Sequence, residues 1–313
     1  MRRFYLMRPL YCKLTFRAII RELRIAWGFI NNDIWDTIMP SLLIFITSCI
    51  FNGRSWKDLM IPILISLTYA VLYIYTFCIS NQIDGIEEDR INKPYRPLVT
   101  GFVTMKETFT RMYAYNFVYL VYALFLGLFW YSLAWTIISY YLNLGGWSNH
   151  WISKNLVGMT LGTFILFNVQ WQIALQPEQV ISYRTQAYFA MMSIWAGFAL
   201  PIQDLRDVAG DLKGGRKTLP IAVGDRKARI ILSIHYFLFL PAIFLCAMLT
   251  MVPLKEVISK PLNISIFIIQ MIVHWLVAYR LLVYTTPEAD HRSYLLYVLL
   301  FCAAIPMVCV LKS

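Results

Sequence analysis

Three aspartates near residue 210 have the spacing of a metal-binding helical face. Asp204, Asp207 and Asp211 follow one another at intervals of three and four residues. Residues at this spacing share one face of an α-helix, so the three carboxylates would repel one another unless a cation lay between them. Carboxylate oxygens suit Mg²⁺, whose coordination is usually completed by water and by substrate phosphate oxygens. The spacing therefore predicts a magnesium site that receives a phosphorylated molecule.

A second oxygen-rich segment lies far upstream and repeats this pattern. Asn81, Asp84 and Glu88 have the same spacing as the three aspartates. Each segment is followed by a basic stretch, and the candidate substrate-binding residues there are Lys93, Arg96, Lys213, Arg216 and Lys217. Acids that hold a metal and bases that hold anionic oxygens are what a diphosphate requires. Either segment alone could be ordinary solvated charge, but the two together favour a diphosphate site.

The composition indicates that these segments are positioned by a membrane protein. Of 313 residues, 59% are hydrophobic and 14% charged, and the mean hydropathy is +0.59. Apolar runs of spanning length recur along the chain, which excludes a secreted disulfide scaffold, a disordered chain and a soluble nucleic-acid binder. We attribute the net charge of +11 to lipid-facing and orienting charges or to a bound anionic substrate, with no nucleic acid. Nothing in the sequence indicates an obligate protein partner.

The apolar runs predict an all-α, multi-pass bundle of about nine transmembrane helices. The run from 112 to 143 is divided near Trp130, because about 30 apolar residues exceed one bilayer crossing. The nine expected helices cover residues 34–51, 59–81, 112–128, 130–143, 155–174, 187–203, 228–252, 262–285 and 292–311.

The basic residues predict the orientation of this bundle. Most of the 28 Lys and Arg residues fall at the N-terminus and in alternate loops, which places the N-terminus and both acidic loops on the cytoplasmic side. Residues 1–33 form a basic amphipathic segment, in which 16–30 suits a helix lying at the headgroup level. Residues 34–313 form a single transmembrane domain. In a eukaryotic cell, the expected membrane is the endoplasmic reticulum.

With both segments in view, the sequence resembles the UbiA superfamily of intramembrane prenyltransferases. The resemblance covers nearly the whole chain and rests on the segment Asn81 to Asp89 with its following Asn-Lys-Pro, and on Asp204-x-x-Asp207-x-x-Gly-Asp211. It implies a nine-helix bundle in which the acids hold Mg²⁺ on the diphosphate of an isoprenoid donor. By the resemblance, this metal-binding role falls to Asn81, Asp89, Asp204, Asp207 and Asp211, of which Asp89, Asp207 and Asp211 are the expected catalytic residues.

The first segment departs from the family pattern, in which acids stand four and eight residues after the asparagine. Gly85 occupies the middle position and Asp89 keeps the last, while Asp84 and Glu88 are each displaced by one residue. The metal could therefore be bound through Asp84 and Glu88 on the Asn81 face, or through Asp89. This form of the segment is similar to that of the fungal UbiA-type terpene cyclases.

The chemistry that the resemblance implies begins with ionisation of an allylic diphosphate. Mg²⁺ and the basic residues would stabilise the departing negative charge. The carbocation left behind needs a dry pocket, and aromatic faces both attract cations and exclude water. Candidates for lining this pocket near the acidic ends of the spans include Tyr73, Tyr75, Phe77, Trp171, Trp195 and Phe198.

The sequence leaves two reactions of the carbocation open, cyclisation and transfer to an aromatic acceptor. Attack by a double bond of the same chain, with farnesyl diphosphate as the expected donor, makes the protein a terpene cyclase. Attack by an aromatic acceptor makes it a prenyltransferase. The first span offers Asp33, Asp36 and Ser48 but no arginine until Arg54, which disfavours a polar acceptor and so favours cyclisation. A transporter is disfavoured because the polar residues lie at one predicted membrane face rather than at mid-span.

Overall fold

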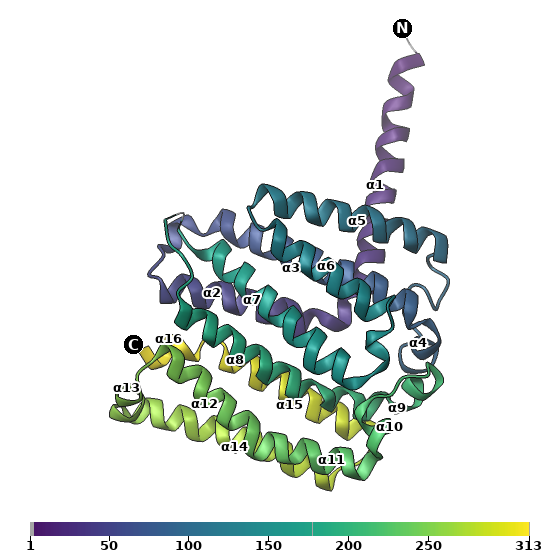
Figure 1. Cartoon of the computed structure of the whole chain (residues 1–313). Helices are drawn as coiled ribbons and strands as arrows, with labels where there is room; N and C mark the ends of the chain where they lie inside the picture. Colours follow the sequence, from purple (N-terminus) through teal and green to yellow (C-terminus); the bar gives the residue numbers. More distant parts are fainter. Residues whose placement is uncertain (1–2, 177, 313) are drawn as a thin grey trace.

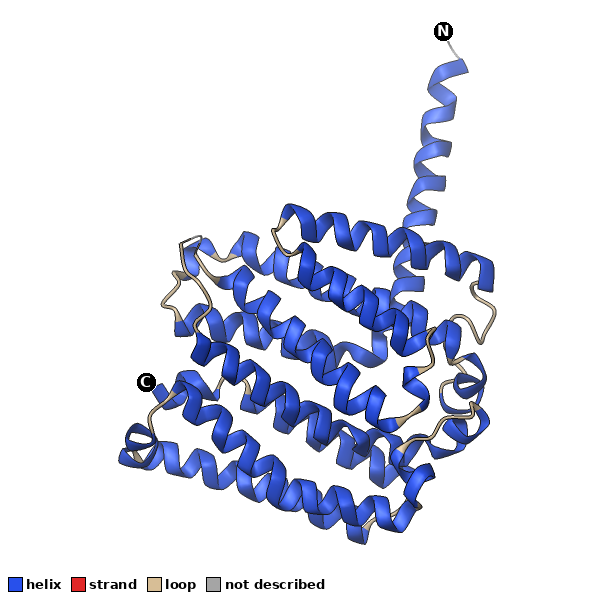
Figure 2. Ribbon diagram, viewed as in Figure 1, coloured by secondary structure: helices blue, strands red, loops and turns tan. Residues whose placement is uncertain are grey.

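The computed structural model is a bundle of helices packed side by side, from which the N-terminal helix projects (Figure 1). The structure describes residues 3–176 and 178–312, with the side chains of 3–15 and 56 excepted. Within these residues it contains no strand, and one isolated bridge joins His150 to Lys217 (Figure 2). The all-α class is confirmed.

The α-helices are α1 (Arg3–Ile30), α2 (Met39–Phe51), α3 (Met60–Asp84), α4 (Ile86–Asn92), α5 (Met105–Phe125), α6 (Phe129–Asn143), α7 (Thr160–Ala174), α8 (Tyr183–Ala199), α9 (Asp204–Lys213), α10 (Leu219–Val223), α11 (Asp225–Ile234), α12 (Leu240–Met251), α13 (Leu254–Ser259), α14 (Pro261–Val283), α15 (Pro287–Ala304) and α16 (Met307–Lys312).

Each of the nine expected ranges coincides with a helix in the structure. Some of these helices include a π-helical stretch. The π-helical stretch Ile34–Ile38 precedes α2, Ile152–Met159 precedes α7, and His235–Phe239 joins α11 to α12. The division of the run from 112 to 143 is confirmed, although the break comes slightly before Trp130. There α5 ends at Phe125 and Gly127 adopts φ 71°, a left-handed conformation that glycine accepts without strain.

Six helical segments within the described residues are long and apolar enough to cross a membrane. They are Phe16–Phe51, Met60–Asp84, Ile152–Ala174, Asp225–Met251, Pro261–Val283 and Pro287–Lys312. The protein is therefore an integral membrane protein. The helices α6 and α8, of 15 and 17 residues, are shorter than this group, so nine crossings remain a prediction. Residues 16–30 are helical and form the start of the first of the six segments, and their place at the headgroup level stays a prediction.

The two acidic segments are helical, which corrects the expectation of acidic loops. The first comprises the last turn of α3 and, after a break at Gly85, the short helix α4, while the second is α9. The helices α4 and α9 pack together through Asn92. Its side-chain amide donates to the Asp207 carbonyl oxygen at 3.0 Å, and its side-chain oxygen accepts from the Gly210 N–H at 3.2 Å. A Cβ atom at Gly210 would overlap Asn92, so the absence of a side chain there allows the two segments to meet.

The buried apolar residues form two large clusters, one on each side of the site. One cluster includes Tyr73 and Trp135 from the first half of the chain, and the other includes Phe167, Tyr297 and Phe301 from the second half. Because both clusters contribute to the walls of one cavity, the packing of the two halves creates the site.

Candidate active site

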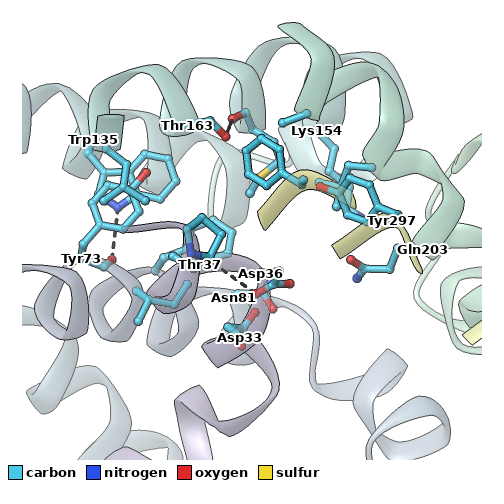
Figure 3. A pocket seen from close by; sticks show the side chains of 18 of the residues that line it. Asp33, Asp36, Thr37, Tyr73, Asn81, Trp135, Lys154, Thr163, Gln203 and Tyr297 are labelled. Atoms are coloured by element: carbon cyan, nitrogen blue, oxygen red, sulfur yellow. Dashed lines mark hydrogen bonds between the residues drawn. The ribbon is translucent and has the colours of Figure 1, made fainter. Parts of the chain in front are cut away.

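A cavity of about 130 Å³ lies between the two halves of the bundle. Its aromatic lining consists of Tyr73, Phe77, Trp135, Phe167, Tyr297 and Phe301. Its polar lining includes Asp33, Asp36, Asn81, Glu88, Lys93, Arg96, Lys154, Gln203 and Arg216. Figure 3 shows Tyr73 and Trp135 together at one side of this space and Lys154 well away from them. The cavity thus combines an ionic region with an aromatic one.

Acids and bases from both acidic segments are interleaved beside the cavity. The Arg216 Nη1 atom lies 2.7 Å from Glu88 Oε2 and 3.9 Å from Asp211 Oδ1, so this one guanidinium bridges the two segments. The Lys154 Nζ atom lies 2.9 Å from Asp204 Oδ1, and the Asn155 amide donates to the other oxygen of Asp204 at 3.2 Å. The structure therefore brings residues of both segments to one place, as their spacing predicted.

Asp211 is the least satisfied carboxylate of this group. Its side chain is fully buried, and neither carboxylate oxygen has a hydrogen-bond partner. Burial raises the pKa of Asp211 to about 7, although the positive charge of Lys154 opposes this shift. Two buried carboxylate oxygens without a hydrogen-bond partner have lone pairs free to bind a cation. This feature fits a hard divalent ion such as Mg²⁺.

The acids expected to bind metal are not gathered into a preformed cage in the described part of the chain. Among the residues that the structure describes, no group of three or more His, Cys, Asp or Glu side chains is close enough to hold a metal ion. Glu88 and Asp204 instead each form an ion pair, with Arg216 and Lys154. The donor atoms of these acids are nevertheless all oxygens, which Mg²⁺ prefers. Mg²⁺ usually binds to one or two carboxylates together with substrate phosphates, so the lack of a complete protein cage is consistent with such a site.

The three acids of the first segment occupy different environments. Glu88 lines the cavity, whereas Asp84 is exposed. Both oxygens of Asp89 accept from Arg96 Nη1, at 2.8 and 2.7 Å, and the two side chains are buried together. Burial raises the pKa of Asp89, with the Arg96 charge opposing the shift. Of the two alternatives left open by the sequence, this geometry favours the Asn81 face, through Glu88.

The remaining expected site residues lie away from the cavity wall. The Asp207 carboxylate lies 3.4 Å from Arg206 Nε and does not line the cavity. Lys213 and Lys217 are exposed and do not line it either. Of the expected site residues, the structure brings Asn81, Glu88, Lys93, Arg96 and Arg216 to the cavity wall. Asp204, Asp211 and Asp89 do not line the cavity themselves, but they lie beside Lys154, Arg216 and Arg96, which do.

Comparison with known proteins identifies the family. Residues 41–305 match the UbiA prenyltransferase family. The chain belongs to this family. It is 35% identical over 300 residues to the diterpene cyclase eriG of Hericium erinaceus, a match that covers 92% of this chain and 88% of the relative. It is 31% identical over 302 residues to the polyprenyl transferase eriF of the same organism, covering 92% and 94%. The resemblance read from the motifs is thus confirmed, and the protein is an enzyme of the UbiA type.

Solved UbiA structures share the fold. A UbiA homologue from Archaeoglobus fulgidus bound to DMAPP and Mg²⁺ superimposes with a TM-score of 0.63 at 16% identity, covering 91% of this chain and 99% of that one. At this identity, the similarity concerns the fold alone.

Sequence reasoning missed one cation of this UbiA-family site. Lys154 lines the cavity and pairs with Asp204, but it is not among the substrate-binding residues expected from the sequence. It is the one Asp, Glu, Lys or Arg between Arg111 and Glu178. A charge isolated in so long an apolar stretch is a functional signal.

The aromatic expectations were partly met. Tyr73 and Phe77 line the cavity, whereas Tyr75, Trp171, Trp195 and Phe198 do not. Trp195 lies one layer behind the wall, because its ring stacks on Phe301 with centroids 5.4 Å apart. The sequence did not indicate Trp135, Phe167, Tyr297 and Phe301, because the rotation of each helix about its own axis decides which face meets the cavity.

Proposed function

We propose that this UbiA-family protein is a membrane-bound, Mg²⁺-dependent terpene cyclase that ionises a prenyl diphosphate and cyclises the resulting cation. The observation that carries the proposal is a single cavity joining an ionic region, supplied by both acidic segments, to an aromatic region. An ionic region suits a diphosphate, and an aromatic one suits the carbocation that its departure leaves.

The ionic region would hold the diphosphate and its metal. In this proposal Asn81, Glu88, Asp204 and Asp211 hold Mg²⁺, which when bound neutralises the charge on the departing diphosphate. Lys93, Lys154 and Arg216 donate to its oxygens. Lys93 forms no ion pair within the described part of the chain, so it can meet the anion without first leaving a carboxylate. Arg96 stays with Asp89 and fixes the turn after α4.

The roles inferred for the other acids are indirect. The backbone carbonyl of Asp207 accepts from Asn92, so residue 207 helps to hold the two segments in register through its backbone, while its carboxylate pairs with Arg206. Asp89 would act by positioning Arg96, and Asp84, which is exposed, would contribute little. Lys213 and Lys217 could attract the anionic substrate to the mouth of the site without contacting it.

The aromatic region would guide the carbocation. Phe77, Trp135, Tyr297 and Phe301 line the cavity from three different helices. An aromatic face stabilises a nearby cation by about 0.5–2 kcal/mol, with the larger values in desolvated sites. The same side chains exclude the water that would quench the intermediate.

Two observations favour cyclisation over transfer. The first-span side of the cavity presents Asp33 and Asp36, and Asp36 accepts a hydrogen bond from the Tyr294 hydroxyl at 2.6 Å. A negatively charged aromatic acceptor would be repelled from this side. In addition, a relative named as a diterpene cyclase is 35% identical to the chain.

Prenyl transfer to an aromatic acceptor is the second candidate function. It is supported by the 31% identity, over 92% of the chain, to a protein named as a polyprenyl transferase. Both functions use the same first step, so they share the ionic region and differ in what meets the cation.

Farnesyl diphosphate is the donor that we propose to test first, together with geranylgeranyl diphosphate, because the name of the diterpene cyclase relative points to the longer chain. We further propose that the N-terminus faces the cytoplasm, as the distribution of basic residues indicates, and that in a eukaryotic cell the enzyme resides in the endoplasmic reticulum.

The test is to incubate the purified protein with each donor, with Mg²⁺ or with EDTA, in the presence and absence of pooled aromatic acceptors. Mass spectrometry of the extracts then identifies the products. A cyclic terpene formed with Mg²⁺ and without acceptor supports the cyclase. Product found only with an acceptor assigns the protein to the transferases instead.

A further inference from the structure

One face of α3 runs along the cavity from its ionic region into its aromatic region. Asn81, Phe77 and Tyr73 are spaced by four residues, and all three line the cavity. Residues at this spacing lie almost above one another on a helix. Between Asn81 and Tyr73 the helix rises by about 12 Å. Tyr73 therefore lies deep in the cavity relative to the ionic residues.

Tyr73 and Trp135 form a stacked pair at this depth. Their ring centroids are 4.4 Å apart and the rings are nearly parallel, at 7°. The Trp135 indole N–H donates to the Tyr73 carbonyl oxygen at 3.2 Å, and the Tyr73 hydroxyl donates to the Gly162 carbonyl oxygen at 2.9 Å. Figure 3 shows the two side chains together, with the bond from Trp135 drawn. Both rings are thus held in place by hydrogen bonds as well as by packing.

The space behind this pair is filled. A Cβ atom at Gly162 would lie 2.5 Å from the Trp135 ring, so the indole already rests against the backbone of α7. On the α3 side, the Tyr69 hydroxyl bonds to those of Tyr119 and Ser132 at 2.7 Å each, and all three side chains are fully buried. Displacing them would break a buried hydrogen-bond network. On the α3 side, the cavity therefore ends at Tyr73 and Trp135.

We propose that the Tyr73–Trp135 pair is the end wall that sets the longest prenyl chain this enzyme accepts. The proposal rests on the proposed function, in which the diphosphate lies beside Asn81 and the chain extends toward Tyr73. An isoprene unit spans about 5 Å when extended, from ordinary carbon–carbon bond lengths. A depth of about 12 Å along α3 thus holds two to three extended units. A longer chain must fold back on itself, so removing the wall should favour longer donors.

The test compares variants of Trp135 with a matched tryptophan elsewhere. Trp135→Ala removes an indole larger than one isoprene unit, and Trp135→Phe removes part of it. Trp171→Ala is the control, because Trp171 is equally buried but does not line the cavity. Each protein receives an equimolar mixture of farnesyl, geranylgeranyl and geranylfarnesyl diphosphates, and the consumption of each donor is measured. Unreactive thiolodiphosphate analogues of the same chain lengths provide a separate binding measurement.

For Trp135→Ala we expect the ratio of longer to shorter donor consumed to rise by at least about tenfold, since even one methylene in an apolar pocket changes selectivity this much. Trp135→Phe should shift the ratio in the same direction by less, and Trp171→Ala should leave it unchanged. Gly162→Ala should lower the ratio, because its methyl group would push the indole into the cavity.

If a folded Trp135→Ala protein consumed longer and shorter donors in the wild-type ratio, the proposal that Tyr73 and Trp135 set the longest donor would be refuted. If that protein does not fold, Trp135→Phe decides in the same way. The ratio in which competing donors are consumed or bound reports how each chain fits the cavity, whether the cation then cyclises or meets an acceptor, so the two proposals can fail separately. Wild-type protein that consumes donors only when an acceptor is present would refute the cyclase and leave the wall testable. Selectivity that stays fixed in an acceptor-independent enzyme would refute the wall alone.

Discussion

The two acidic segments carry the same spacing of oxygen-bearing side chains but present them differently. In the second segment, α9 is an uninterrupted helix that buries both Asp204 and Asp211 near Lys154 and Arg216. In the first, Gly85 separates α3 from α4, and Glu88 is the acid that lines the cavity. The difference shows that a repeated spacing does not guarantee a repeated geometry.

The glycine of the first segment explains part of this difference. A Cβ atom at Gly85 would lie 3.2 Å from Arg216 Nη2 and 3.4 Å from Glu88 Oε2. The space of a side chain at position 85 is thus taken by the ion pair between the two segments. The family pattern has an acidic side chain at this position. In this chain, the guanidinium of Arg216 and the carboxylate of Glu88 take its place.

Asp211→Asn should have the largest effect. It keeps the shape of a buried side chain but removes the charge that we assign to Mg²⁺. Activity should fall by about 100-fold or more, in the range seen for removal of one strong electrostatic contact. The protein should remain folded, because neither Asp211 oxygen has a hydrogen-bond partner to lose. Diphosphate release and thermal unfolding measure the two effects, and near-normal activity would contradict the assignment of Asp211.

Glu88→Gln should have the next largest effect, and Asp84→Asn is its matched control. Glu88 lines the cavity and pairs with Arg216, so its loss should lower activity by about 10- to 100-fold and raise the Mg²⁺ concentration needed. Asp84 is exposed, and its amide variant should remain within about twofold of wild type. The comparison is a titration of rate against Mg²⁺. The reverse ranking would assign the metal to Asp84 instead of Glu88.

Asp89→Asn should act on stability more than on chemistry. It leaves the buried Arg96 guanidinium without its carboxylate, and breaking a buried pair in this way costs about 3–5 kcal/mol. The midpoint of thermal unfolding should fall clearly, while the Mg²⁺ requirement of the folded fraction stays unchanged. A raised Mg²⁺ requirement at unchanged stability would instead make Asp89 a metal ligand.

The pH dependence of Mg²⁺ binding should show the smallest effect. Burial raises the pKa of Asp211 to about 7, above its ordinary value, so in the absence of metal the group is protonated below that pH. Mg²⁺ must displace this proton, and its affinity should therefore fall by up to about tenfold per pH unit below 7 and level off above it. Stabilisation of the protein by Mg²⁺ at pH 6, 7 and 8 measures this. Equal affinity at all three values would show that no such proton is displaced.

Much of the fold could be read from the sequence, because hydrophobic runs and turn residues are local signals. The helical ranges and the break near Gly127 follow from them. The joining of the two acidic segments also followed, since their shared chemistry implied a shared site. The pairing of residues far apart, such as Arg216 with Glu88, depends on how α4 and α9 pack. That packing rests on Asn92 and on the lack of a side chain at Gly210, which no periodicity reveals.

The choice among neighbouring acids could not be predicted for the same reason. Asp84, Glu88 and Asp89 differ by only a few residues, yet one is exposed, one lines the cavity and one is buried against Arg96. The break at Gly85 turns the helix between them, and its angle depends on the tertiary contacts of α4. Lys154 shows the complementary case, because a charge isolated in a long apolar stretch is visible in the sequence without any information on packing.

The most direct test of the account is acceptor-free turnover by the purified protein. Wild-type and Asp211→Asn proteins are incubated with farnesyl or geranylgeranyl diphosphate and Mg²⁺, and both diphosphate release and terpene products are measured. The account predicts that the wild type releases diphosphate in step with a cyclic terpene, that EDTA stops both, and that Asp211→Asn loses both. Wild-type protein that forms no cyclic product from either donor, or an Asp211→Asn protein that forms it at the normal rate, would contradict it.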